Sequence, residues 1–351
     1  FDADGLANGR IVDPGAPGLI TLNQLQLSQA QLAQVSPRNA DTLSFNVRFS
    51  DSVKQVDVSD FKLNFTGNAQ GQIQFVEKIY DNLYRVQVNQ LGGDGSVALS
   101  LNQAANNIVN LTGTSITQAD ISAPHILESH IANRSNSEKI AALYTLMYHR
   151  APDYSGLQYW LSEMEHGKTM TDIARAFAGH SRFLSDYASL SNQQFVEVMY
   201  KEGLGNQGDS TGVAYWTGKI NQGQSRPDML AEFALATITA DLVSAKKSQA
   251  LSDADYWAAS VRQNALLNRV DLGLEFAMKF GSASDPREAS DLDVAYHAAK
   301  LLLTKVDASD DSLEAALLSL QTANSVSQVA ALMHSSPQVE LVGMHLVTDL
   351  L

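Results

Sequence analysis

The amino-acid sequence predicts a multidomain chain in which an N-terminal all-β, Ig-like sandwich is followed by an all-α helical repeat domain. Apolar and polar residues alternate through the first third of the chain, which is the period of strands with one buried face. After Pro124 the apolar spacing becomes helical and the composition shifts towards Ala, Leu, Met and acidic residues. One short signature then occurs twice, which indicates a duplicated helical unit.

Composition narrows the class of protein. The chain has 351 residues, of which 44% are hydrophobic and 18% charged, with a net charge of −14 and no cysteine. The charge argues against a nucleic acid as partner, because phosphates are neutralised by clustered Lys and Arg. The lack of cysteine excludes disulfides, thiolate catalysis and Cys-type zinc sites. We expect no transmembrane segment, and the start at Phe1 rather than Met predicts a processed form or a fragment.

Five segments follow from these patterns. Residues 1–34 are expected to be an irregular lead-in or an edge strand, and residues 35–122 the Ig-like sandwich. Residues 123–136 are a predicted linker, 137–285 the helical repeat domain, and 286–351 a C-terminal helical extension of that domain. Strands are expected at 43–49, 56–58, 61–65, 73–75, 84–88 and 97–101. Helices are expected at 137–149, 155–166, 169–179, 192–202, 212–222, 226–244, 253–265, 268–280, 290–303, 311–321 and 325–334.

The repeated signature is an Asp, a Gly three residues later, and a Tyr-Trp pair after that. Its two copies lie 56 residues apart and comprise Asp153, Gly156, Tyr159 and Trp160, and Asp209, Gly212, Tyr215 and Trp216. Upstream, residues 143–148 match residues 195–200 at an offset of 52, which predicts a four-residue insertion within 203–209. Tyr256-Trp257 followed by Phe276 indicates a third, degraded copy.

At these residues the sequence resembles a known family. The stretch Tyr148-His-Arg-Ala-Pro-Asp153, continuing to Trp160, and the stretch from Asp172 to Phe183 resemble the DUF4214 helical domain of bacterial surface proteins. Residues 267–276 resemble its later portion, so that the likeness covers residues 138–345. The family is similar to lipopolysaccharide-anchoring regions of some surface-layer (S-layer) proteins and, more distantly, to phycobilisome linker domains.

A second resemblance concerns the β segment. Residues 43–107, with Asp and Gly in their turns, resemble the Ig-like repeats of large calcium-dependent exported adhesins, whereas the resemblance to S-layer and RTX-like proteins concerns the DUF4214 helical domain. Taken together, the two resemblances imply a secreted or surface-bound interaction protein and do not identify a catalyst.

Two interpretations apply to the aspartates. Asp153 could ligate calcium with neighbouring backbone oxygens, and Asn206, Asp209 and Ser210 in the predicted insertion loop form the better calcium candidate. Alternatively, Asp153 and Asp209 each cap the helix that follows, because exposed amides and the helix dipole favour a carboxylate there. One acidic residue per loop falls short of the six to eight oxygens that calcium takes, which favours capping.

Two interpretations also apply to the aromatic pairs. Tyr159 with Trp160, and Tyr215 with Trp216, could be stacking platforms for sugar rings. Alternatively, the tryptophans lie in the core and pack one helix pair on the next, because they stand at helical spacing from apolar neighbours. The tyrosines are the more open question.

We therefore expect a non-enzymatic module of a secreted or bacterial cell-surface protein that acts in surface attachment or assembly. It would bind a cell-surface polysaccharide such as lipopolysaccharide, or self-associate with sister subunits, with calcium as cofactor. No HExxH, G-x-S-x-G or P-loop motif is present. Two alternatives stay open: a helical scaffold that binds a small apolar ligand or a protein partner in an interhelical groove, and an enzyme with an unrecognised site in the helical domain.

Overall fold

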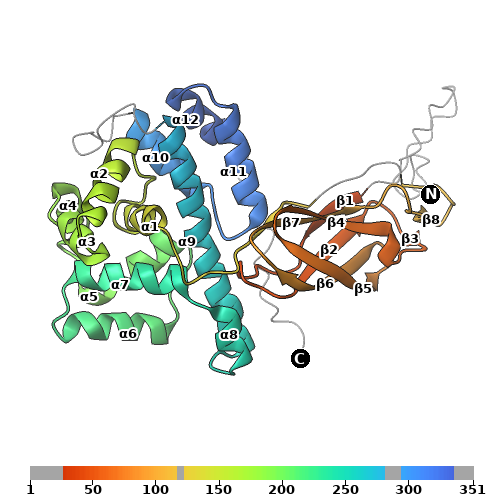
Figure 1. Cartoon of the computed structure of the whole chain (residues 1–351), viewed down its shortest axis with the longest axis horizontal. Coiled ribbons are helices and arrows are strands. Elements are labelled where there is room, and N and C mark those ends of the chain that lie inside the picture. Colours follow the sequence, from red (N-terminus) through yellow and green to blue (C-terminus); the bar gives the residue numbers. More distant parts are fainter. Residues whose placement is uncertain (1–26, 117–121, 281–293, 336–351) are drawn as a thin grey trace, which may run out of the picture.

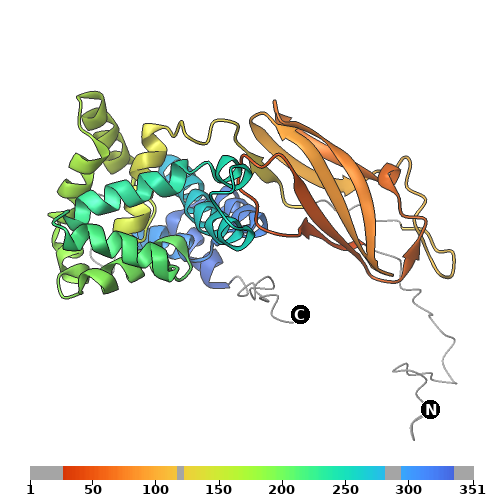
Figure 2. The same ribbon diagram turned by 90° about the horizontal axis from the view of Figure 1, so that it is seen from below.

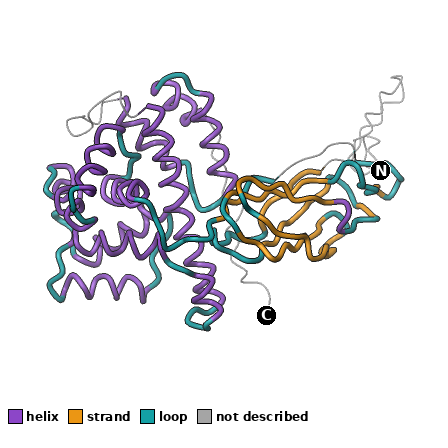
Figure 3. The backbone as a smooth tube through the Cα atoms, in the orientation of Figure 1, coloured by secondary structure: helices purple, strands orange, loops and turns teal. Residues whose placement is uncertain are grey.

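The structure, a computed structural model, describes residues 27–116, 122–280 and 294–335. Strands and helices occupy opposite ends of an elongated molecule (Figures 1 and 2). Apart from one short helical turn at Val58–Asp60, the described strands all precede the described helices along the chain (Figure 3). This arrangement confirms the predicted fold class of a β unit followed by a helical unit. In the described parts of the chain, no helix combines the length and the hydropathy that a membrane crossing requires.

The β unit consists of antiparallel sheets. The first has the order β1-β2-β6-β5, with β1 at Leu27–Leu32, β2 at Leu43–Phe49, β6 at Leu83–Gly92 and β5 at Gln70–Tyr80. The second has the order β4-β7-β9, with β4 at Phe61–Gly67, β7 at Gly95–Leu101 and β9 at His125–Leu127. A short pair joins β3 (Val53–Lys54) to β8 (Val109–Asn110).

The alternation in the sequence decides which face of each strand is buried. Phe45 and Val47 of β2 are fully buried, whereas Asn46 between them is half-buried and Arg48 is exposed. Val97 and Leu99 of β7 belong to the same apolar cluster, so the two larger sheets share one core.

The structure corrects two expectations for this unit and agrees with one of the alternatives for a third. The strand predicted at 56–58 is wrong, because Asp57 caps a 3₁₀ turn, η1 (Val58–Asp60), whose amides its side chain accepts. Strand β9 lies inside the predicted linker 123–136 and pairs with β7. Strand β1 is an edge strand within the predicted segment 1–34, while residues 1–26 of that segment lie outside the described residues.

The helical unit contains thirteen labelled helices among the described residues. They are α1 (Asn136–Tyr148), α2 (Tyr154–Glu165), α3 (Met170–Ala178), α4 (Ser181–Tyr187), α5 (Asn192–Val198), the π-helix η2 (Met199–Gly203), α6 (Ser210–Asn221), α7 (Arg226–Thr239), α8 (Leu242–Lys247), α9 (Asp253–Phe280), α10 (Val294–Thr304), α11 (Asp310–Thr322) and α12 (Val326–Ser335).

Three helix expectations are wrong. The helices expected at 253–265 and 268–280 are one helix of 28 residues, α9, so the helix break that a third repeat would require is absent from this segment. The helix expected at 226–244 ends at Thr239, and α8 follows after Asp241 caps its first turn. Helix α4 was not expected at all.

Helix α9 is continuous because its polar residues are buried and bonded. Gln263, Asn264 and Asn268 are at most 2% exposed. The Gln263 amide donates to the carbonyls of Thr237 and Ala240, and Asn264 donates to Ser36 in the loop between β1 and β2. Asn268 donates to two carbonyls before α11, and Arg269 donates to the end of η2. Each turn of α9 therefore holds a different segment of the chain.

Arg38 joins the β unit to α9. Its guanidinium is 2% exposed and donates to Glu128 Oε1 at 2.7 Å, Asn268 Oδ1 at 3.0 Å and Asp271 Oδ2 at 2.6 Å. Glu128 also pairs with Arg134 at 2.5 Å. Burial acts to raise the pKa of Glu128, but Arg38 and Arg134 outweigh it and hold that pKa below its ordinary value. The β unit and α9 are therefore joined by a network of paired charges.

Substituting Arg38→Ala should lower the free energy of unfolding by about 3–5 kcal/mol, because it leaves Asp271 without its buried cation and Glu128 with Arg134 alone. The measurement is chemical denaturation followed by circular dichroism. Arg85→Ala is the matched control, since its ion pair with Glu77 is exposed, and it should cost at most about 1 kcal/mol. Equal effects of the two substitutions would contradict a structural role for the Arg38 network.

Candidate functional site

The two repeats superpose in sequence at one constant offset. Ser135 caps α1 and Ser191 caps α5, which places the equivalent N-caps 56 residues apart. Thr169 and Ser225 cap α3 and α7 at the same offset. The expected offset of 52 upstream, and with it the four-residue insertion within 203–209, is therefore wrong.

Each repeat builds the same aromatic cluster. A tyrosine of the first helix meets a phenylalanine of the third edge to face, at 4.8 Å for Tyr144 on Phe177 and 5.1 Å for Tyr200 on Phe233. The tryptophan of the second helix packs on the same phenylalanine at 5.4 Å in the first repeat and 5.3 Å in the second. These T-shaped contacts are the favoured geometry of aromatic pairs. Trp216 is buried and Trp160 packs against the core, which favours the core interpretation of both.

The glycine of the signature makes room for this cluster. A Cβ at Gly156 would lie 2.4 Å from Tyr144 Oη and 2.8 Å from Asp153 Oδ2. At Gly212 it would lie 2.5 Å from Tyr200 Oη. The Asp-x-x-Gly spacing thus places the capping carboxylate and the buried hydroxyl against the first turn of a helix, where a side chain would clash with both.

The signature aspartates are capping residues that also face an arginine. Asp153 Oδ1 accepts the Gly156 amide at 2.7 Å, and Asp209 Oδ1 accepts the Gly212 amide at 2.7 Å. The other oxygen lies 3.6 Å from Arg150 in the first repeat and 3.3 Å from Arg262 in the second. These contacts favour the capping interpretation, because both carboxylate oxygens face donors of the protein.

The remaining calcium candidates lie beside Asp209. Asn206 Oδ1 accepts the amide of Gln207, and Ser210 is the first residue of α6. Within the residues that the structure describes, nowhere do three or more His, Asp or Glu side chains converge in a way that could hold a metal ion.

The tyrosines of the signature are exposed, unlike the tryptophans. Tyr159 is 48% exposed and Tyr215 is 55% exposed. Each ring meets its neighbouring tryptophan edge to face, at 4.8 Å and 5.0 Å. Figure 1 places α3 and α7 between α2, which carries Tyr159, and α6, which carries Tyr215.

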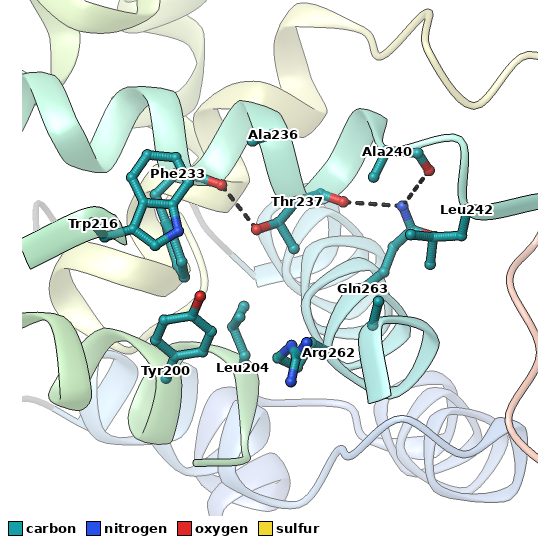
Figure 4. Close-up of a pocket in the computed structure, with 11 residues that line it drawn as sticks. Tyr200, Leu204, Trp216, Phe233, Ala236, Thr237, Ala240, Leu242, Arg262 and Gln263 are labelled. Atoms are coloured by element: carbon teal, nitrogen blue, oxygen red, sulfur yellow. Dashed lines mark hydrogen bonds between the residues drawn. The ribbon is translucent and has the colours of Figure 1, made fainter. Parts of the chain in front are cut away.

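The second repeat contains a cavity of about 150 Å³ that the sequence did not indicate. Aromatic walls come from Tyr200, Trp216 and Phe233, and α9 contributes Arg262 and Gln263 (Figure 4). Arg262 lies 5.9 Å from the Tyr200 ring centroid, as Arg150 lies 4.8 Å from Tyr144 in the first repeat. The second repeat thus takes its arginine from a distant helix.

His149 is a buried histidine at the end of α1. It ends α1 at a positive φ of 52°, and its Nε2 lies 2.7 Å from the Tyr187 hydroxyl. Burial is the main cause that lowers its pKa to about 4; the nearby Glu202 opposes this shift, and Lys300 adds to it. A buried neutral histidine of this kind is a structural group rather than a base in a cleft.

Two segments, residues 124–182 and 174–239, match the family described as Domain of unknown function (DUF4214). Together they span both repeats, so the DUF4214 part of the resemblance is confirmed for residues 124–239. No curated protein and no solved structure matches the chain.

Substituting Gly156→Ala should destabilise the protein by about 1–3 kcal/mol, although alanine is the better helix former, because the new methyl group overlaps Tyr144 and Asp153. Gly218→Ala is the matched control in α6, where a Cβ would meet nothing within 4 Å, and it should stabilise by about 0.5–1 kcal/mol. Thermal or chemical unfolding measures both. A stabilising Gly156→Ala would refute the steric role of the signature glycine.

Stability should fall as the pH drops from about 6.5 to about 4. The folded-state pKa of His149 is lower than that of the unfolded chain, so its contribution is present above the unfolded pKa and is lost on acidification. The full loss is about 3 kcal/mol. Because carboxylates titrate in the same range, the measurement compares the wild type with His149→Asn, whose side chain tolerates the left-handed backbone. Identical pH profiles of the two proteins would contradict this assignment.

Proposed function

We propose that this chain is a non-enzymatic attachment module of a secreted or cell-surface protein and that it binds a cell-surface polysaccharide through its helical repeats. The observation that carries the proposal is the exposure of Tyr159 and Tyr215 at equivalent positions of two otherwise well-packed repeats. In both copies an exposed Tyr directly precedes a Trp that packs on the core, as a repeated contact residue requires.

Each tyrosine is fixed in orientation, which favours binding. The adjacent tryptophan meets its ring edge to face, and the tryptophan is itself anchored on the core phenylalanine. A ring held in this way loses little conformational freedom when a ligand stacks on it. Sugar rings present axial C–H faces that suit such aromatic surfaces.

The separation of the two platforms favours a polymer over a single sugar. Helices α3 and α7 lie between the two helices that carry the tyrosines (Figure 1), which favours a surface with many polysaccharide chains over one small ligand as the partner of both. Simultaneous engagement raises the overall affinity through effective concentration.

The β unit serves as a spacer in this proposal. We also propose that it is an Ig-like repeat of the kind found in exported adhesins, which its sequence resembles. The buried network around Arg38 supports a spacer of fixed orientation. Calcium enters as a bridging ion, since a protein with a net charge of −14 repels an anionic polysaccharide unless divalent cations mediate the contact.

The test measures binding of the protein to lipopolysaccharide immobilised on a sensor surface, in calcium buffer. Tyr159→Ala and Tyr215→Ala should each weaken binding about fivefold, since each removes an aromatic contact worth about 1 kcal/mol, and the double variant should bind far more weakly. Tyr80→Ala, at a tyrosine of β5 that is 67% exposed, is the matched control and should bind as the wild type does. Undiminished binding of the double variant would overturn the proposal.

Chelation tests the role of calcium separately. Removal of calcium should abolish attachment to lipopolysaccharide and leave the unfolding temperature nearly unchanged, because the bridging ion lies between the protein and the ligand. If attachment survives chelation but still depends on the two tyrosines, the bridging role of calcium is wrong and the tyrosine contacts stand.

A further inference from the structure

We propose that the cavity of the second repeat binds a single planar ring of benzene size that carries an anionic group, as in a small aromatic carboxylate. The cavity lies between α6, α7 and α9 (Figure 4), and Tyr215 is not among the residues that line it. Its ligand and its test are independent of the polysaccharide platforms.

The first repeat contains the occupant that the second repeat lacks. Tyr148 stacks on Phe177 with ring centroids 5.1 Å apart and an interplanar angle of 27°, and its hydroxyl donates to the Phe177 carbonyl at 2.9 Å. The imidazole of His180 packs edge to face on the same tyrosine at 6.0 Å. A planar ring of the protein itself thus fills this position.

Both filling side chains are replaced by small aliphatic ones in the second repeat. At the offset of 56, Tyr148 corresponds to Leu204 and His180 to Ala236, and both Leu204 and Ala236 line the cavity. The surrounding aromatic cluster is retained, because Tyr200 and Trp216 keep their edge-to-face contacts with Phe233. The second repeat therefore preserves the walls of a ring-binding position and omits the ring.

The size of the cavity fits this occupant. A volume of about 150 Å³ lined by apolar side chains accepts a molecule of benzene size, as is known for apolar cavities of that volume.

Two polar side chains of α9 that line the cavity indicate which polar groups the ligand ring should carry. Arg262 offers five donors, and the contact of its Nη2 with Asp209 leaves others for an anionic group of the ligand. Gln263 is 1% exposed and is held through its amide nitrogen, while its Oε1 is buried without a hydrogen-bond partner among the described residues. A hydroxyl group on the ring would supply that missing donor.

The test titrates 4-hydroxybenzoate into the full chain and follows the methyl resonances of Leu204, Ala236 and Thr237 by NMR. Saturable shifts are expected, with a dissociation constant of about 0.1–10 mM for so small a ligand. Two matched probes separate the contribution of the anionic group from that of the planar ring. 4-Hydroxybenzyl alcohol lacks the charge, 4-hydroxycyclohexanecarboxylate lacks the planar ring, and each should bind about tenfold more weakly.

Variants test the site itself. Leu204→Tyr with Ala236→His refills the cavity as in the first repeat and should abolish binding, and Ala236→Leu is a smaller filling change should the double variant fail to fold. Arg262→Gln should weaken 4-hydroxybenzoate about tenfold while leaving the affinity of the neutral alcohol unchanged. Absence of saturable shifts, shifts confined to methyl groups outside the cavity, or undiminished binding by the folded filled variant would each overturn the proposal.

Discussion

Buried polar side chains on α9 require partners, and the way in which they find them shapes the rest of the molecule. Once water is excluded, an amide or guanidinium without a hydrogen bond costs free energy, so the segments that supply carbonyls and carboxylates must stay in place. Gln263 fixes the end of α7, Asn264 the loop after β1, and Arg269 the end of η2. Asn268 and Asp271 receive Arg38 from the β unit, and His125 of β9 meets Asp310 of α11 at 3.0 Å. One helix thereby couples both repeats and the β unit.

The two repeats show how one supersecondary unit can diverge without losing its fold. Both repeats share the residues that hold the helices together, namely the capping aspartate, the glycine, the tyrosine, the tryptophan and the phenylalanine. Differences are confined to positions around it. Tyr148 and His180 complete the core of the first repeat, whereas Leu204 and Ala236 leave a cavity in the second. Arg150 is replaced in its role by Arg262 of α9, so the second repeat depends on α9 in a way that the first does not.

Local patterns in the sequence predict much of this, and tertiary contacts account for what they miss. Alternation identified β2 and its buried face, and the repeated signature identified the capping aspartates and the aromatic pairs, because caps and strand faces depend on near neighbours. The upstream offset was misjudged by four residues, about one helical turn, since such a shift returns apolar residues to the same face. The break predicted between residues 265 and 268 is absent, and the contacts of Asn268 with Arg38 and distant carbonyls explain a continuous α9. The role of Arg262 could not be predicted from its sequence neighbours, because its partner Asp209 is far away in sequence.

The central claim is that the contacts of α9 make the β unit and the helical repeats one rigid body, which presents the repeats at a fixed distance from the β unit. Since the chain has no cysteine, spin labels can be placed uniquely at Lys62→Cys in β4 and Lys168→Cys between α2 and α3, both exposed positions. The most direct measurement is the distribution of distances between these labels by pulsed electron paramagnetic resonance. A single narrow population is predicted. A broad distribution, or several populations, would contradict the coupling of the two units through α9.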